Sequence, residues 1–206
     1  MTTLPFRFAG QSFFARPART LWWPARRALV LADLHLGKSE RMARRGGALL
    51  PPYETQDTLD RLEAELDATQ PDEVFLLGDS FDDDFARDAL PDAVTARIEG
   101  LTRHGRWRWI AGNHDGGAAI DEMSVDGIAL RHIAGQGPDI SGHYHPKAII
   151  ARQRVPVFVV GRNHLIMPAF GTYTGGLLID DPALSPLAQG RYVITTGRSC
   201  RCLPVR

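Results

Sequence analysis

The sequence predicts an α/β fold in which two packed β-sheets are flanked by helices. Strand-like and helix-like segments alternate in the first half of the chain, and short strand-like segments follow in the second half. Polar residues stand directly after four of the apolar segments. With 206 residues, 44% of them hydrophobic and 23% charged, the chain has the size and composition of one globular domain. No boundary is evident, so a single domain is expected over residues 1–206.

The first half contains the clearest helical periodicity. Leu59, Leu62 and Leu66 recur at the i, i+3 and i+7 spacing of one helical face. A helix with one buried stripe is therefore expected over Tyr53–Thr69. The other elements expected in this half are a hairpin over Phe6–Phe14, strands over Arg27–Ala32, Val74–Leu77 and Trp107–Ala111, and a helix over Pro91–Arg103.

After Gly127 the pattern changes to short strands. They are expected over Ile128–Arg131, Pro138–Ser141, Ala148–Arg152, Val155–Gly161, Leu165–Met167 and Tyr192–Thr196. The turn residues at Gly161-Arg162-Asn163 favour a hairpin at that point. The segment from Asp180 to Gly190 is expected to be an exposed loop.

Four short motifs follow four of the expected strands. They are Asp33-Leu34-His35, Gly78-Asp79-Ser80-Phe81-Asp82, Gly112-Asn113-His114-Asp115 and Gly142-His143-Tyr144-His145. One Asp-x-His or His-x-His pair is more often a turn or a polar strand end than a ligand pair. Four such motifs in order could bring carboxylate, amide and imidazole groups to one pocket. We interpret them as a two-metal hydrolytic site, which needs oxygen and nitrogen ligands from several loops and a bridging carboxylate.

The ligands divide into two sets around Asp79, the expected bridge. Asp33, His35 and His145 are assigned to the first metal, and Asn113, His132 and His143 to the second. His132 stands alone after a strand, and its place between the third and fourth motifs favours a ligand role. His114 is left to contact the substrate. His104 and His164 match no motif and are expected to be structural.

These residues resemble the calcineurin-like metallophosphoesterase superfamily, whose elements occur here in the same order. The finer features resemble the ligase-associated DNA damage response endonucleases. They are Leu21-Trp-Trp-Pro24, Ala32-Asp-Leu-His-Leu-Gly-Lys38, Leu130-Arg-His132, Gly142-His-Tyr-His-Pro146 and Pro168-Ala-Phe-Gly-Thr-Tyr-Thr-Gly-Gly176. The match runs from about Leu21 to Gly176. One position departs from this branch, because Asp82 stands where the branch often has His.

The resemblance implies a four-layer αββα sandwich and a two-metal phosphodiesterase that cuts DNA, usually with manganese. Iron or zinc would also suit mixed oxygen and nitrogen ligands. A repair helicase and a DNA ligase are the implied partners. Asp82, the residue of the wider superfamily, is expected to orient a metal ligand without touching the metal.

The expected reaction is in-line attack of a hydroxide, shared by the two cations, on phosphorus. His114, held by Asp115, would protonate the departing oxygen or stabilise its charge. The leading function is a DNA endonuclease that acts on single strands in DNA repair. The alternative is a phosphatase or a small-molecule or cyclic-nucleotide phosphodiesterase. A lipid-pyrophosphate hydrolase is disfavoured, because the sequence has no apolar insertion for an acyl chain. A non-catalytic scaffold is also disfavoured, because such a protein has no reason to keep His114 along with every ligand.

Charge and hydropathy limit where and how DNA could bind. The 24 basic and 24 acidic residues cancel, so DNA binding needs a local patch. Lys38, Arg41 and Arg45 would share one face of a helix over 38–45, where a solvated basic face is the alternative interpretation. The next candidates are Arg152, Arg154 and Arg162. Neither a run of about 18 apolar residues nor a signal peptide is evident, so a cytoplasmic enzyme without membrane contact is expected.

Overall fold

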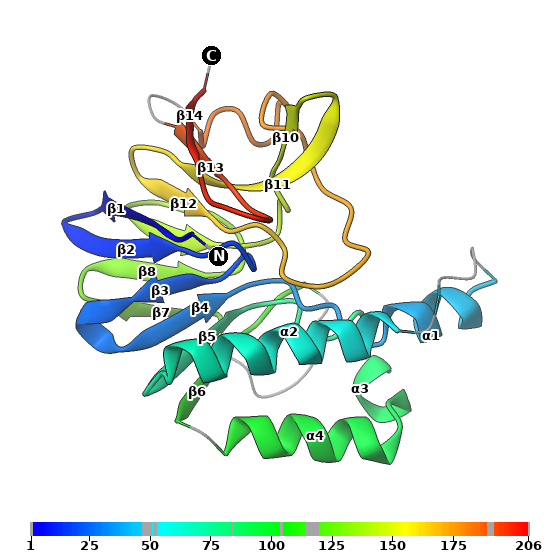
Figure 1. Ribbon diagram of the computed structural model, residues 1–206. Coiled ribbons are helices and arrows are strands. Elements are labelled where there is room, and N and C mark those ends of the chain that lie inside the picture. The colour runs from blue at the N-terminus through cyan, green and yellow to red at the C-terminus, as the bar shows by residue number, and fades with distance from the viewer. Residues whose placement is uncertain are drawn as a thin grey trace.

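The computed structural model describes residues 2–46, 51, 53–83, 85–103, 105–113, 120–188 and 192–205. Two β-sheets lie face to face, and helices cover the outer face of one of them (Figure 1). The predicted α/β class with two packed sheets and helices is therefore confirmed. Within the described ranges, no helix is long and apolar enough to cross a membrane.

The first sheet has the strand order β1-β2-β3-β4-β5-β6. Its strands are β1 (Leu4–Phe8), β2 (Gln11–Ala15), β3 (Leu21–Trp23), β4 (Ala28–Leu31), β5 (Glu73–Leu77) and β6 (Arg106–Ile110). The predicted hairpin is confirmed, because β1 and β2 pair antiparallel with Phe6 opposite Phe13. The strands β4, β5 and β6 run parallel, so their carboxyl ends lie at one edge of the sheet.

The second sheet has the order β14-β13-β11-β12-β9-β8-β7, and β10 pairs with β11. Its strands are β7 (Glu122–Val125), β8 (Ile128–Arg131), β9 (Asp139–Ser141), β10 (Lys147–Ile150), β11 (Gln153–Val160), β12 (His164–Ile166), β13 (Tyr192–Thr195) and β14 (Cys202–Pro204). The strands β8 and β9 are parallel. The edge strands β7 and β14 were not predicted, because three of the four residues of β7 are not buried and β14 contains a proline.

The two sheets bury a shared apolar core. Phe13 and Trp23 pack from the first sheet with ring centroids 5.0 Å apart, and Phe158 and Ile194 belong to the same cluster from the second. These side chains are almost inaccessible to solvent. Their burial fixes the two sheets together and so positions the loops at their shared edge.

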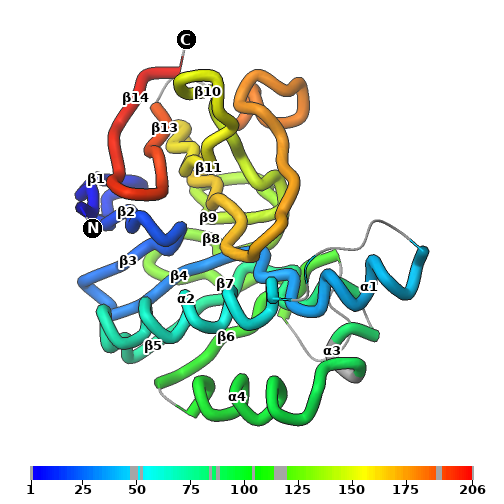
Figure 2. The backbone as a smooth tube through the Cα atoms, turned by 45° about the vertical axis from the view of Figure 1, so that its right-hand side comes forward, coloured from blue at the N-terminus to red at the C-terminus, as the bar shows by residue number. Residues whose placement is uncertain are grey.

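The helical elements are the 3-10 helix η1 (Pro24–Arg26), α1 (Lys38–Arg44), α2 (Glu54–Thr69), α3 (Ala86–Ala89) and α4 (Asp92–Thr102). Of these, α2 and α4 pack against the outer face of the first sheet. Leu59, Leu62 and Leu66 of α2 are buried against Leu29 and Val74, which confirms the predicted stripe. Figure 2 shows α1 and α3 at the end of this layer, away from the strands β1 and β2.

The outer face of the second sheet is covered by a segment that was expected to be exposed. Leu184 and Ala188 are buried against Val157 and Val193, so the prediction of an exposed loop over 180–190 is wrong for these residues. The segment is turn-rich, as expected, and within residues 177–188 it forms no helix. Its few apolar side chains cover this face of the second sheet, and they are not spaced at a helical period, so the sequence pattern did not indicate their burial.

Candidate metal centre

Both sheets deliver the predicted ligands to one place. Asp33 and His35 follow β4, Asp79 and Asp82 follow β5, and Asn113 follows β6; His132 follows β8, and His143 and His145 follow β9. The carboxyl ends of parallel strands are where α/β proteins commonly bind ligands. The sheets meet directly here, because the His143 N–H donates to the Asp33 carboxylate at 3.1 Å.

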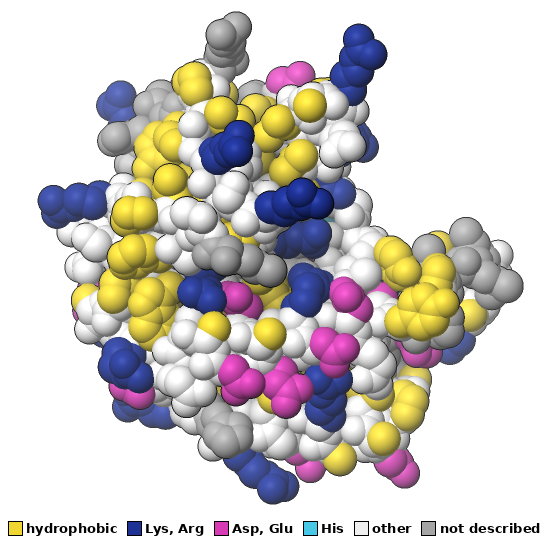
Figure 3. All heavy atoms as spheres, viewed as in Figure 1, with side chains coloured by type: hydrophobic (Ala, Val, Ile, Leu, Met, Phe, Trp, Pro, Cys, Tyr) yellow, Lys and Arg dark blue, Asp and Glu magenta, His cyan; other side chains and the backbone are white. Residues whose placement is uncertain are grey.

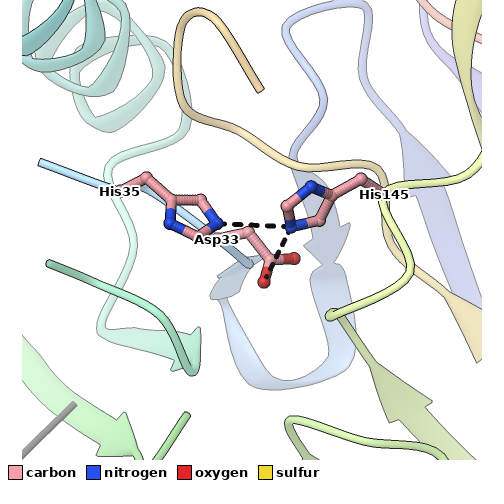
Figure 4. A group of neighbouring side chains, drawn as sticks. All are labelled: Asp33, His35 and His145. Atoms are coloured by element: carbon pink, nitrogen blue, oxygen red, sulfur yellow. Dashed lines mark hydrogen bonds and ion pairs between the residues drawn. The ribbon is translucent and has the colours of Figure 1, made fainter. Parts of the chain in front are cut away.

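Asp33, His35 and His145 form the first group of donors. One donor atom from each lies within 4.8 Å of the other two. Figure 4 shows both imidazole rings turned toward the Asp33 carboxylate, with Nε2 of His145 3.4 Å from its Oδ1. The two Nε2 atoms of His35 and His145 are 3.3 Å apart. The ring nitrogens and the carboxylate thus converge on one point.

Asp79, His132 and His143 form the second group, also within 4.8 Å of one another. Asn113 completes it, with Oδ1 2.9 Å from Nε2 of His132 and 3.0 Å from Nδ1 of His143. The amide oxygen is a neutral ligand, so this group could hold a second cation without a further negative charge.

Asp79 faces both groups with a single oxygen. Its Oδ2 lies 3.4 Å from Nε2 of His132 and 3.9 Å from Nε2 of His35. This position suits the bridging role predicted for Asp79, which stays a prediction. The shared oxygen lies between the two groups, where one carboxylate could serve two cations.

The far sides of two of the ligand rings are also held. Nδ1 of His132 lies 2.9 Å from the Leu77 carbonyl oxygen, and Nδ1 of His35 lies 3.0 Å from Oδ1 of Asp82. A partner on one ring nitrogen fixes the ring and leaves the other nitrogen for a cation. The donor set and its support therefore fit two divalent cations.

The surroundings of the two histidines in the second group shift their pKa values in opposite directions. Burial alone would lower the pKa of His132, but its hydrogen bond to Asp79 and the charge of Asp33 raise that pKa above the usual value. Burial, followed by the nearby His132, lowers the pKa of His143. A divalent cation binds neutral imidazole and would compete with the proton on His132.

Most of the predicted ligands have a strained backbone. The φ angles are 56° at Asp33, 47° at His35, 47° at Asp79, 69° at His143 and 46° at His145. The left-handed region is uncommon for residues other than glycine and costs on the order of 1–3 kcal/mol at each position. Such strain gathers at functional sites, and here it turns each side chain from the strand end toward the shared pocket.

Two motif glycines are required by close approach. A Cβ at Gly78 would collide with the ring of His132, and a Cβ at Gly112 would collide with the backbone nitrogen and side chain of Asp79. Each glycine therefore makes room for a ligand from another strand. The close approach of another ligand loop therefore explains why glycine stands at these two positions.

Asp82 supports His35 and is itself surrounded by cations. It is 1% exposed, accepts from Nε of Arg41, and lies 3.7 Å from Nζ of Lys38. Burial would raise the Asp82 pKa, but His35, Lys38 and Arg41 together lower it, so the carboxylate stays ionised. Its predicted role of orienting a ligand is consistent with this contact and stays a prediction.

The basic face predicted to bind DNA is turned toward the loop after β5. The side chains of Lys38 and Arg41 are 17% and 19% exposed and pair with Asp82, whereas Arg45 is 65% exposed and lies 3.6 Å from Asp83. DNA binding by these three residues stays a prediction. Lys38 and Arg41 are paired with Asp82, so Arg45 is the residue of the three that presents most of its side chain to solvent.

Two predicted catalytic residues, His114 and Asp115, lie outside the described residues, as does His104. The leaving-group role of His114 and the orienting role of Asp115 stay predictions. His164 lies away from the donor groups, with Nδ1 2.9 Å from Asp139. This partly buried pairing is consistent with the structural role expected for His164, which stays a prediction.

Comparison with known proteins defines the class. Residues 26–177 match the model of the calcineurin-like phosphoesterase family, so the chain belongs to that family and is a metal-dependent phosphoesterase. The family implies divalent metal ions, and the described residues contain two groups that could hold them. A search of curated proteins finds no match.

Two solved structures are similar over most of the chain. The Pseudomonas putida nuclease MPE is 29% identical, covers 98% of this chain and 100% of its own, and superimposes with a TM-score of 0.79. Yfce, a phosphoesterase from E. coli, is 12% identical, covers 87% of this chain and 99% of its own, and has a TM-score of 0.43.

Proposed function

We propose that this protein is a two-metal phosphodiesterase that acts as a DNA endonuclease, with single-stranded DNA as the favoured substrate and DNA repair as its role. The observation that carries the proposal is the pair of donor groups that share Oδ2 of Asp79. The similarity to a nuclease over 98% of the chain favours DNA over a small ester.

The residues divide the chemical work. When bound, divalent cations lower the pKa of water and withdraw charge from phosphoryl oxygens. Asp33, His35 and His145 would hold one cation, with Asp82 fixing the ring of His35. Asn113, His132 and His143 would hold the other, with the Leu77 carbonyl fixing His132, and Asp79 would belong to both. His114, oriented by Asp115, would donate a proton to the leaving oxygen.

The wider setting is proposed from the family resemblance. Manganese is the favoured metal, although the mixed oxygen and nitrogen donors also suit iron or zinc. A repair helicase and a DNA ligase are the proposed partners, and the cytoplasm is the proposed compartment.

The proposal is tested by offering three substrates to the manganese-loaded protein. They are circular single-stranded DNA, a nitrophenyl phosphodiester and the matching monoester. We expect the circles to be converted to linear strands and then to shorter fragments, together with hydrolysis of the diester. Asp79→Asn, purified in parallel, controls for contaminating nucleases. Turnover of the monoester with intact circles would reject the endonuclease in favour of a phosphatase.

A further inference from the structure

A large basic cleft lies apart from the predicted metal ligands. It has a volume of about 910 Å³, and none of those ligands lines it. Its walls come from α2, the turn between β2 and β3, the hairpin β10–β11 and residues 172–174. Figure 3 shows Lys and Arg side chains gathered around a hollow above α2.

The acids that line the cleft already have partners. Glu65 accepts from Arg16 and from the Thr20 hydroxyl. Asp57 pairs with Arg61 at 3.1 Å and accepts from Thr172. Five basic and two acidic side chains line the cleft, so its formal charge is +3.

Three of the cleft cations have no carboxylate partner among the described residues. Arg19 donates only to the carbonyl oxygens of Ala169 and Gly171, at 3.3 and 3.4 Å. Nζ of Lys147 donates to the Thr174 carbonyl at 2.9 Å. Arg154 is exposed and forms no ion pair with any described residue. Burial, and then the charge of Arg61, lowers the Arg19 pKa to about 10. An anion in the cleft would relieve this crowding of positive charge.

The cleft also offers an aromatic surface. Tyr173 lines it, is 41% exposed, and is held in the left-handed region with φ of 59°. Grooves that bind single strands combine cations for the phosphates with aromatic rings on which bases stack. A folded peptide or a small anion would have less use for both features together.

One segment joins the cleft to the predicted metal centre. Residues 172–174 line the cleft, and the Gly171 N–H before them donates to the Asp33 carbonyl at 2.9 Å. The Leu177 N–H after them donates to the Tyr144 carbonyl, beside His145. Both ends of this short wall are therefore fixed to ligand-bearing loops, so the cleft and the predicted metal centre share one segment.

We propose that this cleft binds the single-stranded DNA that extends from the cleavage site. Arg19, Lys147 and Arg154 contact its phosphates, and Tyr173 stacks against a base. The inference rests on the proposed function, because it names the path of the same substrate. It also separates Arg154, which lines the cleft, from Arg152 and Arg162, which do not.

Binding and cleavage are measured separately. The binding probe is a fluorescent phosphorothioate oligothymidylate of about 12 nucleotides, within the length such grooves cover and resistant to cleavage. Its affinity for the metal-loaded protein is measured by anisotropy at several salt concentrations. The variants are Arg154→Glu, Lys147→Gln and Tyr173→Ala. Arg152→Glu is the matched control, because it carries the same charge change on the same hairpin, outside the cleft.

We expect Arg154→Glu and Lys147→Gln each to weaken binding and to reduce the slope of log affinity against log salt by roughly 0.7 per lost contact. Tyr173→Ala should weaken binding roughly five- to a hundredfold. Arg152→Glu should bind as the unaltered protein does, and all four variants should hydrolyse the nitrophenyl diester normally.

The possible failures are distinguishable. If the unaltered protein binds and cuts DNA and the cleft variants do so equally well, the cleft inference is wrong and the endonuclease stands. If the cleft variants lose binding but the unaltered protein cuts no DNA, the cleft is a binding site for single-stranded DNA and the proposed nuclease function fails. Slower hydrolysis of the small diester by Arg154→Glu would overturn the inference, because the residue would then shape the metal centre.

Discussion

Asp82→Ala tests how far a residue that does not touch the metals controls them. The change removes the carboxylate 3.0 Å from Nδ1 of His35, so the ring loses the partner that fixes its orientation. Losing such a support typically costs 10- to 100-fold in metal affinity or activity, which is about 1.4–2.7 kcal/mol. We expect a loss in this range in both manganese affinity and diester hydrolysis, with the protein still folded.

The same change should also lower stability. Removing one member of a buried ion pair costs about 3–5 kcal/mol, because the remaining charge is left in a poorly solvated place. The side chains of Arg41 and Lys38 are 19% and 17% exposed and can turn partly toward water. We therefore expect a loss near the lower limit, about 3 kcal/mol in the free energy of unfolding, measured by urea denaturation.

Asp83→Ala is the matched control for this prediction. Asp83 pairs with Arg44 at 3.0 Å and with Arg45 at 3.6 Å, on the more exposed side of the same loop. Exposed pairs contribute about 0–1 kcal/mol, so stability should change little and manganese affinity should not change. If Asp82→Ala binds manganese as tightly as Asp83→Ala does, Asp82 does not support His35 and the reasoning fails.

Four further predictions address other residues. Asp79→Ala should abolish hydrolysis of every substrate and lose at least one metal ion per protein; activity with two metals retained, by metal analysis, would refute the bridge. His114→Ala should keep both metals and lose far more activity on DNA than on the nitrophenyl diester, whose leaving group needs little protonation; equal losses would argue against that role. Arg45→Ala should lower the salt slope of DNA cleavage by roughly 0.7 if the α1 face contacts phosphate, and an unchanged slope would exclude that path. Burial raises the pKa of both thiols, that of Cys200 to about 11, but Cys202 is exposed, so at pH 8 a thiol reagent should label Cys202 faster than Cys200, which should react only on unfolding; equally fast labelling of two thiols in the folded protein would contradict this assignment.

The parts of the fold predicted correctly are those with a local pattern. The leucines at 59, 62 and 66 identify α2 because helical spacing is a property of neighbouring residues. The four motifs identify the ligand loops because each follows a buried strand. The edge strands β7 and β14 and the burial of Leu184 depend on what packs against them, which periodicity does not report.

The candidate site shows the same division. The grouping of donors followed from motif order, but the pairing of Arg41 with Asp82 joins residues 41 positions apart. A basic helix face has the same sequence pattern whether it meets DNA or a buried carboxylate, so the sequence left both interpretations open. The left-handed backbone at Asp33 and Asp79 could not be predicted from the sequence. A metal ligand at either position needs a carboxylate, so the residue type is the same whatever the backbone conformation.

The position of the predicted ligands at the boundary between the sheets has a mechanical consequence. Asp33 and Asp79 belong to the first sheet, and His132 and His145 come from loops of the second. Cations held by both sets would act as a non-covalent cross-link between the two halves of the chain. A fragment that ends before β8 would keep only part of each donor group. By mass action, a cation at 100 times its dissociation constant would add about 2.7 kcal/mol to the free energy of separating the sheets.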